Sequence, residues 1–144
     1  MITQERLQMV APCGIDCGIC ELYTCKENSE LYERLIERGF PKEKIPCEGC
    51  RGVEGNCPVI PEKCATYVCV QDKGVQFCYE CGEFPCDKLQ PSADRANVLP
   101  HNCKVFNLCV IQRDGVEQFT QQSGGIKQKY YAGKMVIGSG PKVE

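Results

Sequence analysis

Apolar residues recur at helical spacing between residues 28 and 38. Between residues 28 and 38 two apolar pairs stand four residues apart, Leu31 with Leu35 and Tyr32 with Ile36. This spacing places them on one face of a helix. Asn28 or Ser29 can cap its start, and Gly39 ends it. The pattern predicts an amphipathic helix over Asn28–Arg38.

Further apolar patterns predict a mainly helical fold. A second helix is expected over Pro61–Lys73, since proline suits a first helical turn and Gly74 can end the helix. The apolar stretch within Pro100–Arg113 predicts a buried helix, followed by a short one over Val116–Gln122 that Gly124-Gly125 ends. Residues Lys127–Ile137 have β-type side chains around Ala132-Gly133 and predict a small hairpin.

Cysteine changes this picture of a helical protein. The chain has 14 cysteines among 144 residues, one histidine and no tryptophan, and the cysteines are counted in its 42% of apolar residues. The remaining apolar set is thin for a domain of this length. We therefore expect one domain over residues 1–144, a small α-rich (α with minor β) cysteine-rich domain whose irregular loops are stapled by metal.

Charge and hydropathy exclude several classes of function. The net charge is −2, and no apolar run reaches the ~20 residues of a membrane span. The N-terminal residues lack an apolar stretch of the signal-peptide type, so we expect a cytoplasmic protein, in which disulfides rarely persist. Nucleic acid is an unlikely partner, because the lysines near the C-terminus are typical of a solvated face.

The spacing of the cysteines indicates metal binding. Three C-x2-C pairs occur, Cys17/Cys20, Cys47/Cys50 and Cys78/Cys81, each with a glycine inside or beside it (Gly18, Gly49, Gly82). Such a turn brings two thiolates to one ion, and glycine permits the positive φ that it often needs. A thioredoxin-like redox pair would need a βαβ context that the sequence lacks, and a disulfide framework would need an exported protein.

Eleven cysteines are the candidate metal ligands: Cys13, Cys17, Cys20, Cys47, Cys50, Cys57, Cys64, Cys69, Cys78, Cys81 and Cys86. Taken in sequence order they form one group of Cys69, Cys78, Cys81 and Cys86, a second of Cys47, Cys50, Cys57 and Cys64, and a third of Cys13, Cys17 and Cys20, with Cys25 left open. Interleaved groups are equally compatible with the spacing.

Helical geometry restricts these groups. On the helix expected over Pro61–Lys73, Cys64 and Cys69 would point ~140° apart and serve different sites. Cys103 and Cys109 would point ~120° apart on their helix, so we interpret them as packing residues in the core. A helix through Cys13 would contain two unfavourable glycines, which favours a loop instead.

Zinc and an iron–sulfur cluster both accept four thiolates. C-x2-C turns with adjacent glycine favour zinc, and a closed four-thiolate zinc site is structural. The C-x3-C-x2-C run at Cys13 also resembles the cluster motif of radical S-adenosylmethionine enzymes, but their barrel fold needs a longer chain. Asp16 is either a general base or, more simply, a hydrogen-bonded loop carboxylate, and His101 is interpreted as a cap or surface residue.

Three motifs resemble those of a known family: C-G-I-D-C-G-I-C at 13–20, C-E-G-C at 47–50 and C-Y-E-C-G-E-F-P-C-D-K-L at 78–89. The chain is similar in these motifs to the bacterial and archaeal cysteine-rich proteins known as domain of unknown function 3795. The likeness continues loosely to about residue 122. The resemblance implies a cytoplasmic, metal-binding protein and supplies no activity, substrate or catalytic residue.

The sequence therefore predicts a cysteine-rich metal-binding protein, with zinc as the metal. We expect a structural or interaction module that has a protein partner of unknown identity. The alternative is an iron–sulfur or thiol redox protein. No catalytic residue is predicted.

Overall fold

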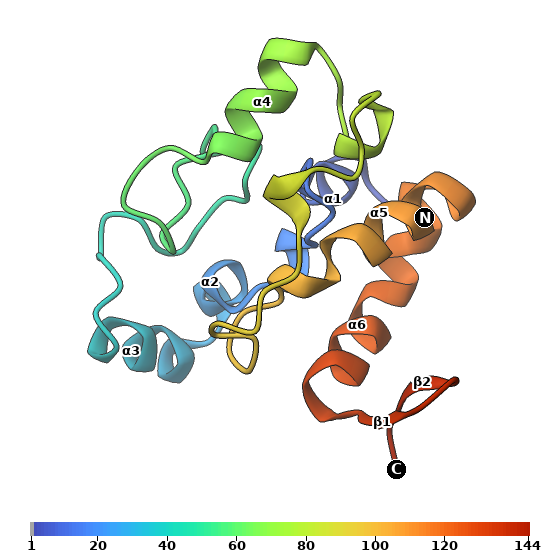
Figure 1. Cartoon of the computed structure of the whole chain (residues 1–144). Coiled ribbons are helices and arrows are strands. Elements are labelled where there is room, and N and C mark those ends of the chain that lie inside the picture. Colours follow the sequence, from blue (N-terminus) through green and yellow to red (C-terminus); the bar gives the residue numbers. More distant parts are fainter. Residues whose placement is uncertain (1) are drawn as a thin grey trace.

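The computed structural model describes residues 2–144, which are mainly helical (Figure 1). The α-helices there are α1 (Gln4–Gln8), α2 (Glu21–Thr24), α3 (Ser29–Glu37), α4 (Ala65–Lys73), α5 (Lys104–Asp114) and α6 (Val116–Ala132). Short 3₁₀ turns are η1 (Cys17–Ile19), η2 (Cys25–Glu27), η3 (Cys78–Glu80), η4 (Asp87–Leu89) and η5 (His101–Cys103). Strands β1 (Lys134–Val136) and β2 (Gly140–Lys142) form an antiparallel pair with Lys134 opposite Lys142.

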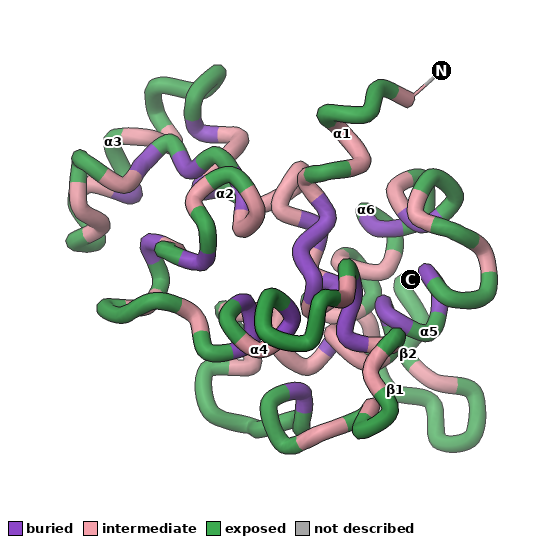
Figure 2. The backbone as a smooth tube through the Cα atoms, turned by 90° about the horizontal axis from the view of Figure 1, so that it is seen from above, coloured by how far each residue is buried: buried purple, intermediate pink, exposed green. Residues whose placement is uncertain are grey.

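The main core forms around α5 and α6, which meet at Gly115 and lie side by side (Figure 1). Phe119 and Leu108 are fully buried there. The cluster also takes in residues of the N-terminal loop, α4 and the segment after it: Val10, Val70, Phe77, Cys78 and Leu89. Figure 2 shows buried backbone along the N-terminal loop and α5, and mostly exposed backbone on the outer parts of the chain. The central core thus joins segments that are far apart in sequence.

A second, smaller cluster lies at α2 and α3. Its buried members are Leu22, Cys25, Leu35, Ile45 and Cys47. The backbone N–H of Cys47 donates to the carbonyl oxygen of Leu22 at 2.7 Å and fixes the following loop against α2.

Residues 38–64 contain no helix and no strand. Turn hydrogen bonds order this segment, among them Gly55 N to Cys50 O at 3.0 Å and Cys64 N to Gly55 O at 2.8 Å. Arg51 ties it to the main core, since its guanidinium donates to the carbonyl oxygens of Val10 at 2.9 Å and Gln76 at 2.8 Å. The segment carries four of the candidate ligands on backbone without regular structure.

Several sequence expectations are confirmed. The expected α-rich fold with one small hairpin is present, and α3 matches its prediction, with the Asn28 side chain accepting a hydrogen bond from Leu31 N at 3.1 Å. The loop around Cys13 is not α-helical, as expected, and contains only the short 3₁₀ turn η1. Within residues 2–144 no helix is both long and apolar enough to cross a membrane.

The prediction for the C-terminal region was wrong. Helix α6 continues through Gly124-Gly125 to Ala132 and does not end at Gln122, and the hairpin therefore begins only at Lys134. Side chains on both sides of the glycine pair anchor the helix: Ser123 donates to Asp16, and Lys127 donates to the carbonyl oxygen of Ile19 at 3.1 Å. Such tertiary contacts outweigh the cost of two glycines, about 1 kcal/mol each.

Two other helix predictions need correction. Helix α4 begins at Ala65, because Cys64 is extended (φ −63°, ψ 120°) and its N–H is held by Gly55. Cys64 therefore precedes the helix, and the argument from helical angle does not apply to it. Cys103 lies in η5, just before α5, and is buried as predicted. The prediction that Cys109 packs in the core was wrong: Cys109 is exposed and Phe106 is 59% exposed, since only one face of α5 meets the core.

Candidate metal centre

Four candidate cysteines line one cavity of about 260 Å³: Cys69, Cys78, Cys81 and Cys86. They come from α4, from both ends of the turn at η3 and from the residue before η4. Lys73 and Glu83 also line this cavity. The structure thus brings together the cysteine group that the sequence predicted from its local spacing.

The thiols in this cavity differ in their surroundings. Burial, with smaller contributions from the nearby thiols of Cys13 and Cys86, raises the pKa of Cys78 to about 12. The pKa of Cys81 is lowered instead, because its sulfur accepts hydrogen bonds from Glu83 N at 3.3 Å and from Lys73 Nζ at 3.1 Å. A cation bound in the cavity would favour the thiolate form of each.

The first cysteine loop, residues 13–20, lies against the turn at residues 47–50. Burial raises the pKa of the Cys17 thiol, and the nearby backbone of Cys50 opposes this rise. A Cβ placed on Gly49 would lie 3.7 Å from the Cβ of Cys17 and 3.0 Å from the sulfur of Met9. Gly49 has the positive φ expected of it, +91°, and leaves room for this close approach. Gly18 and Gly82 do not have positive φ; at Gly18 the Arg6 guanidinium fills the space of a Cβ.

Backbone N–H groups are directed at several of the sulfurs. Gly49 N lies 3.4 Å from the sulfur of Cys47, two residues before it. Glu83 N likewise lies 3.3 Å from the sulfur of Cys81, also two residues before it. Burial raises the pKa of three more thiols, and the N–H two residues on opposes it in each: Ile15 for Cys13, Leu22 for Cys20 and Val59 for Cys57. Such donors stabilise the thiolate, which is the form that binds metal.

Basic side chains lie beside each part of this cysteine array. The positive charge of Lys104 opposes the effect of burial, which raises the pKa of Cys13 and of Cys78. Lys127 has the same opposing effect on the pKa of Cys20. Lys44 has it on the pKa of Cys57. Neither Lys104 nor Lys73 was singled out from the sequence. Lys73 lies one turn after Cys69 on the same helix, and that spacing is the signal that could have identified it.

The sulfurs are neighbours, but they do not converge on a point. Among residues 2–144 no three His, Cys, Asp or Glu side chains stand where they could hold one metal ion. Binding would require the thiols to turn toward one another.

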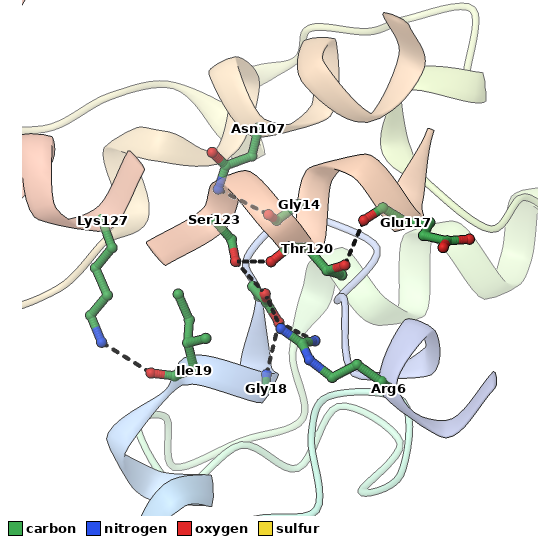
Figure 3. Close-up of polar contacts among 10 residues, drawn as sticks. Arg6, Gly14, Gly18, Ile19, Asn107, Glu117, Thr120, Ser123 and Lys127 are labelled. Carbon is green, nitrogen blue, oxygen red and sulfur yellow. Dashed lines mark hydrogen bonds and ion pairs between the residues drawn. The ribbon is translucent and has the colours of Figure 1, made fainter. Parts of the chain in front are cut away.

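Asp16 is a structural carboxylate. Its side chain is 2% exposed and accepts four hydrogen bonds, from Arg6 Nη1 at 2.9 Å and Nη2 at 2.6 Å, from Gly18 N at 2.9 Å and from Ser123 Oγ at 2.7 Å. Figure 3 shows Arg6, Gly18 and Ser123 approaching from three segments. With its oxygens engaged, Asp16 has no position from which to act as a general base.

Helices α5 and α6 hold the first cysteine loop in place. Besides the Ser123 bond, Asn107 Nδ2 donates to Gly14 O at 3.0 Å, and Lys127 reaches the carbonyl oxygen of Ile19 (Figure 3). Gly14 is in van der Waals range of α5, since a Cβ there would lie 2.9 Å from Leu108 Cγ. No sequence pattern links these residues, which are separated by more than 90 positions.

Two remaining residues stand apart from the array. Cys25 is buried in the smaller apolar cluster and its thiol donates to Leu22 O at 3.4 Å. His101 begins η5 but makes no side-chain cap hydrogen bond; its Nε2 lies 2.9 Å from Ser92 O in the preceding loop.

Comparison with known proteins gives one match. The model of the family described as protein of unknown function (DUF3795) matches residues 9–91. No curated protein and no solved structure matches the chain. The matched range contains the residues that line the cavity and the C-x2-C turns at 17–20 and 47–50. It ends before the looser likeness that the sequence suggested up to about residue 122.

Proposed function

The chain belongs to the DUF3795 family, whose function is unknown, and from that premise we propose that it is a structural zinc-binding protein that presents its ordered loops to a protein partner. The observation that carries this proposal is the cavity lined by Cys69, Cys78, Cys81 and Cys86. Four thiolates form a closed tetrahedral zinc site without an open position for chemistry.

The charges around the cavity support the same proposal. Four thiolates around one Zn²⁺ carry a net charge of about −2, which needs compensation in a partly buried site. Lys73 donates a hydrogen bond to the sulfur of Cys81. The positive charge of Lys104 lowers the pKa of both Cys78 and Cys13, against the larger effect of burial. Since Asp16 is fully hydrogen-bonded, the best-buried carboxylate near the first loop serves structure, which favours a non-enzymatic role.

Metal analysis of the full-length protein, purified without oxygen or chelator, tests the proposal. We expect a colourless protein with stoichiometric zinc, and a lower zinc content per chain for Cys78→Ser. Cys109→Ser is the matched control, because this exposed thiol is outside the array and its loss should leave the zinc content unchanged.

Two results would contradict the proposal: a wild-type protein without stoichiometric metal, or a Cys78→Ser variant that keeps the full content. If the protein instead contains iron with acid-labile sulfide and absorbs visible light, the bound group is an iron–sulfur cluster and not zinc. If Cys78→Ser does not fold, Cys81→Ser gives the same comparison at a less buried position.

A further inference from the structure

Exposed apolar side chains gather near the C-terminal end of the chain. Among residues 2–144 nine large apolar side chains are exposed, and five of them lie between Tyr131 and Val143. Ile137 is 93% exposed and Met135 is 70% exposed, the highest values of the nine. The hairpin that carries them lies at the edge of the molecule, at the lower end of α6 (Figure 1). An exposed apolar group of this kind marks an interaction site.

The hairpin is ordered and attached to α6. Ser139 N donates to Val136 O at 2.9 Å and closes the turn between the strands. A Cβ placed on Gly133 would lie 3.0 Å from Pro141 Cβ, so β2 packs closely against the residue that follows α6. Ile137 stands in the turn, directly after β1. The backbone therefore presents this apolar side chain at a tip, where neither strand buries it.

The same end of the molecule is basic. Residues 118–144 contain four lysines and one glutamate, a net charge of +3, whereas the whole chain carries −2 and residues 1–117 therefore carry −5. In the hairpin Lys134 stands opposite Lys142, at the end of the strands away from the turn. Like charges placed opposite each other destabilise a strand pair. Within the described residues their one carboxylate contact is the exposed ion pair of Lys134 with Glu144 at 3.4 Å. An anionic surface would relieve this repulsion.

The spacing between the tip and the lysines fits the interface of a lipid bilayer. Ile137 is three residues beyond Lys134, and a strand rises about 3.3 Å per residue, so the two positions are separated by about 10 Å. Amphipathic helices at membrane surfaces bury their apolar face to a depth of about 5–10 Å. A tip at a similar depth leaves the lysines at the level of the lipid phosphates. A peptide strand added to the sheet would instead pair with a strand edge and leave the turn exposed.

We propose that the C-terminal hairpin binds the surface of an anionic phospholipid membrane, with Ile137 inserted and with Lys134 and Lys142 beside the lipid phosphates. This is binding at the surface, and it is compatible with the finding that no helix within residues 2–144 can cross a membrane. The proposal goes beyond the zinc-binding function and does not depend on it, because the hairpin contains no cysteine.

Sedimentation of the full-length protein with lipid vesicles tests the proposal. Vesicles of equal parts phosphatidylglycerol and phosphatidylcholine should bind the protein, less so in high salt, and vesicles of phosphatidylcholine alone should bind it far more weakly. Ile137→Ser should lower the partition coefficient for the mixed vesicles about tenfold, and Lys134→Gln should lower it about fivefold. Val98→Ser is the matched control, because Val98 is also β-branched and 62% exposed but lies outside the hairpin. Equal effects of Ile137→Ser and Val98→Ser, or no binding to the mixed vesicles, would overturn the proposal.

A tryptophan at the tip gives a second measurement, which distinguishes lipid from a protein contact. The chain has no tryptophan, so Ile137→Trp places a single indole in the turn. Its emission should shift to shorter wavelength when the mixed vesicles are added, and brominated phosphatidylcholine in those vesicles should quench it, whereas the emission of Val98→Trp should not change. A shift that instead appears with rising protein concentration in the absence of vesicles would show that the tip contacts a second copy of the chain, and it would overturn the proposal.

Discussion

The α5–α6 pair and the segment 38–64 are ordered by different means. The two helices bury Leu108, Ile111 and Phe119 almost completely in the main core. Segment 38–64 has no regular element and buries few large apolar side chains, Ile45 among them. Burial of apolar area, about 25 cal/mol per Å², stabilises the helical pair. The loop segment contributes little of this kind, yet it carries four candidate ligands.

The contrast shows how one short chain combines two sources of order. The first cysteine loop contacts both regions. Helices α5 and α6 bind it through Asn107 and Ser123, and the 47–50 turn lies against its Cys17. Rigid helices thus fix one side of the cysteine array. The other side depends on turns, on Arg51 and, in our proposal, on zinc.

The largest effect of a single substitution is expected in the helical pair. Phe119→Ala removes a fully buried aromatic side chain and leaves a cavity, so it should lower the free energy of unfolding by about 3–5 kcal/mol. Phe106→Ala, on the exposed face of α5, is the matched control and should have a small effect. Denaturant unfolding followed by circular dichroism measures both. Equal effects of the two substitutions would show that the core around Phe119 does not stabilise this half.

Asp16→Ala tests the contacts that hold the first cysteine loop against α6. It leaves Arg6 and Ser123 without their buried acceptor and should lower the free energy of unfolding by about 3 kcal/mol. Asp114→Ala is the control, since it removes a half-buried carboxylate whose partner Arg113 is exposed to solvent, and it should shift the thermal midpoint much less. A midpoint for Asp16→Ala as high as that of Asp114→Ala would contradict the structural role of Asp16.

The smallest effect should be a gain in stability. Gly124 and Gly125 lie inside α6 with open space around the position of a Cβ, so alanine at either site should stabilise the protein by up to about 1 kcal/mol. Gly14→Ala should destabilise instead, because its φ is +92° and its Cβ would meet Leu108 and Lys104. Thermal melts of the three variants give the sign directly. Destabilisation by alanine at Gly124 or Gly125 would contradict this expectation and would indicate that α6 requires glycine at that position.

Local patterns predicted the parts of the fold that local interactions determine. Apolar pairs and a capping asparagine were enough for α3, and cysteine spacing identified the group that lines the cavity. The same reasoning predicted that this helix ends at Gln122, because the long-range anchors of α6 at Asp16 and Ile19 leave no trace in the neighbouring sequence.

The candidate site shows the same limit. The closeness of Cys17 to Gly49 depends on the fold of an irregular segment, and spacing alone leaves interleaved and sequential groups equal. The contact of Lys73 with Cys81 likewise joins a helix end to a later turn. Such contacts are fixed by three-dimensional packing and become visible only in the structure.

Hydrogen–deuterium exchange of the zinc-loaded protein, before and after addition of a chelator, tests the central claim most directly. Amide protection should be lost across residues 41–64 and in the cysteine turns when zinc is removed, while amides of α5 and α6 around Leu108 and Phe119 stay protected. Unchanged exchange in residues 41–64 after complete removal of metal would contradict the claim that zinc orders this segment.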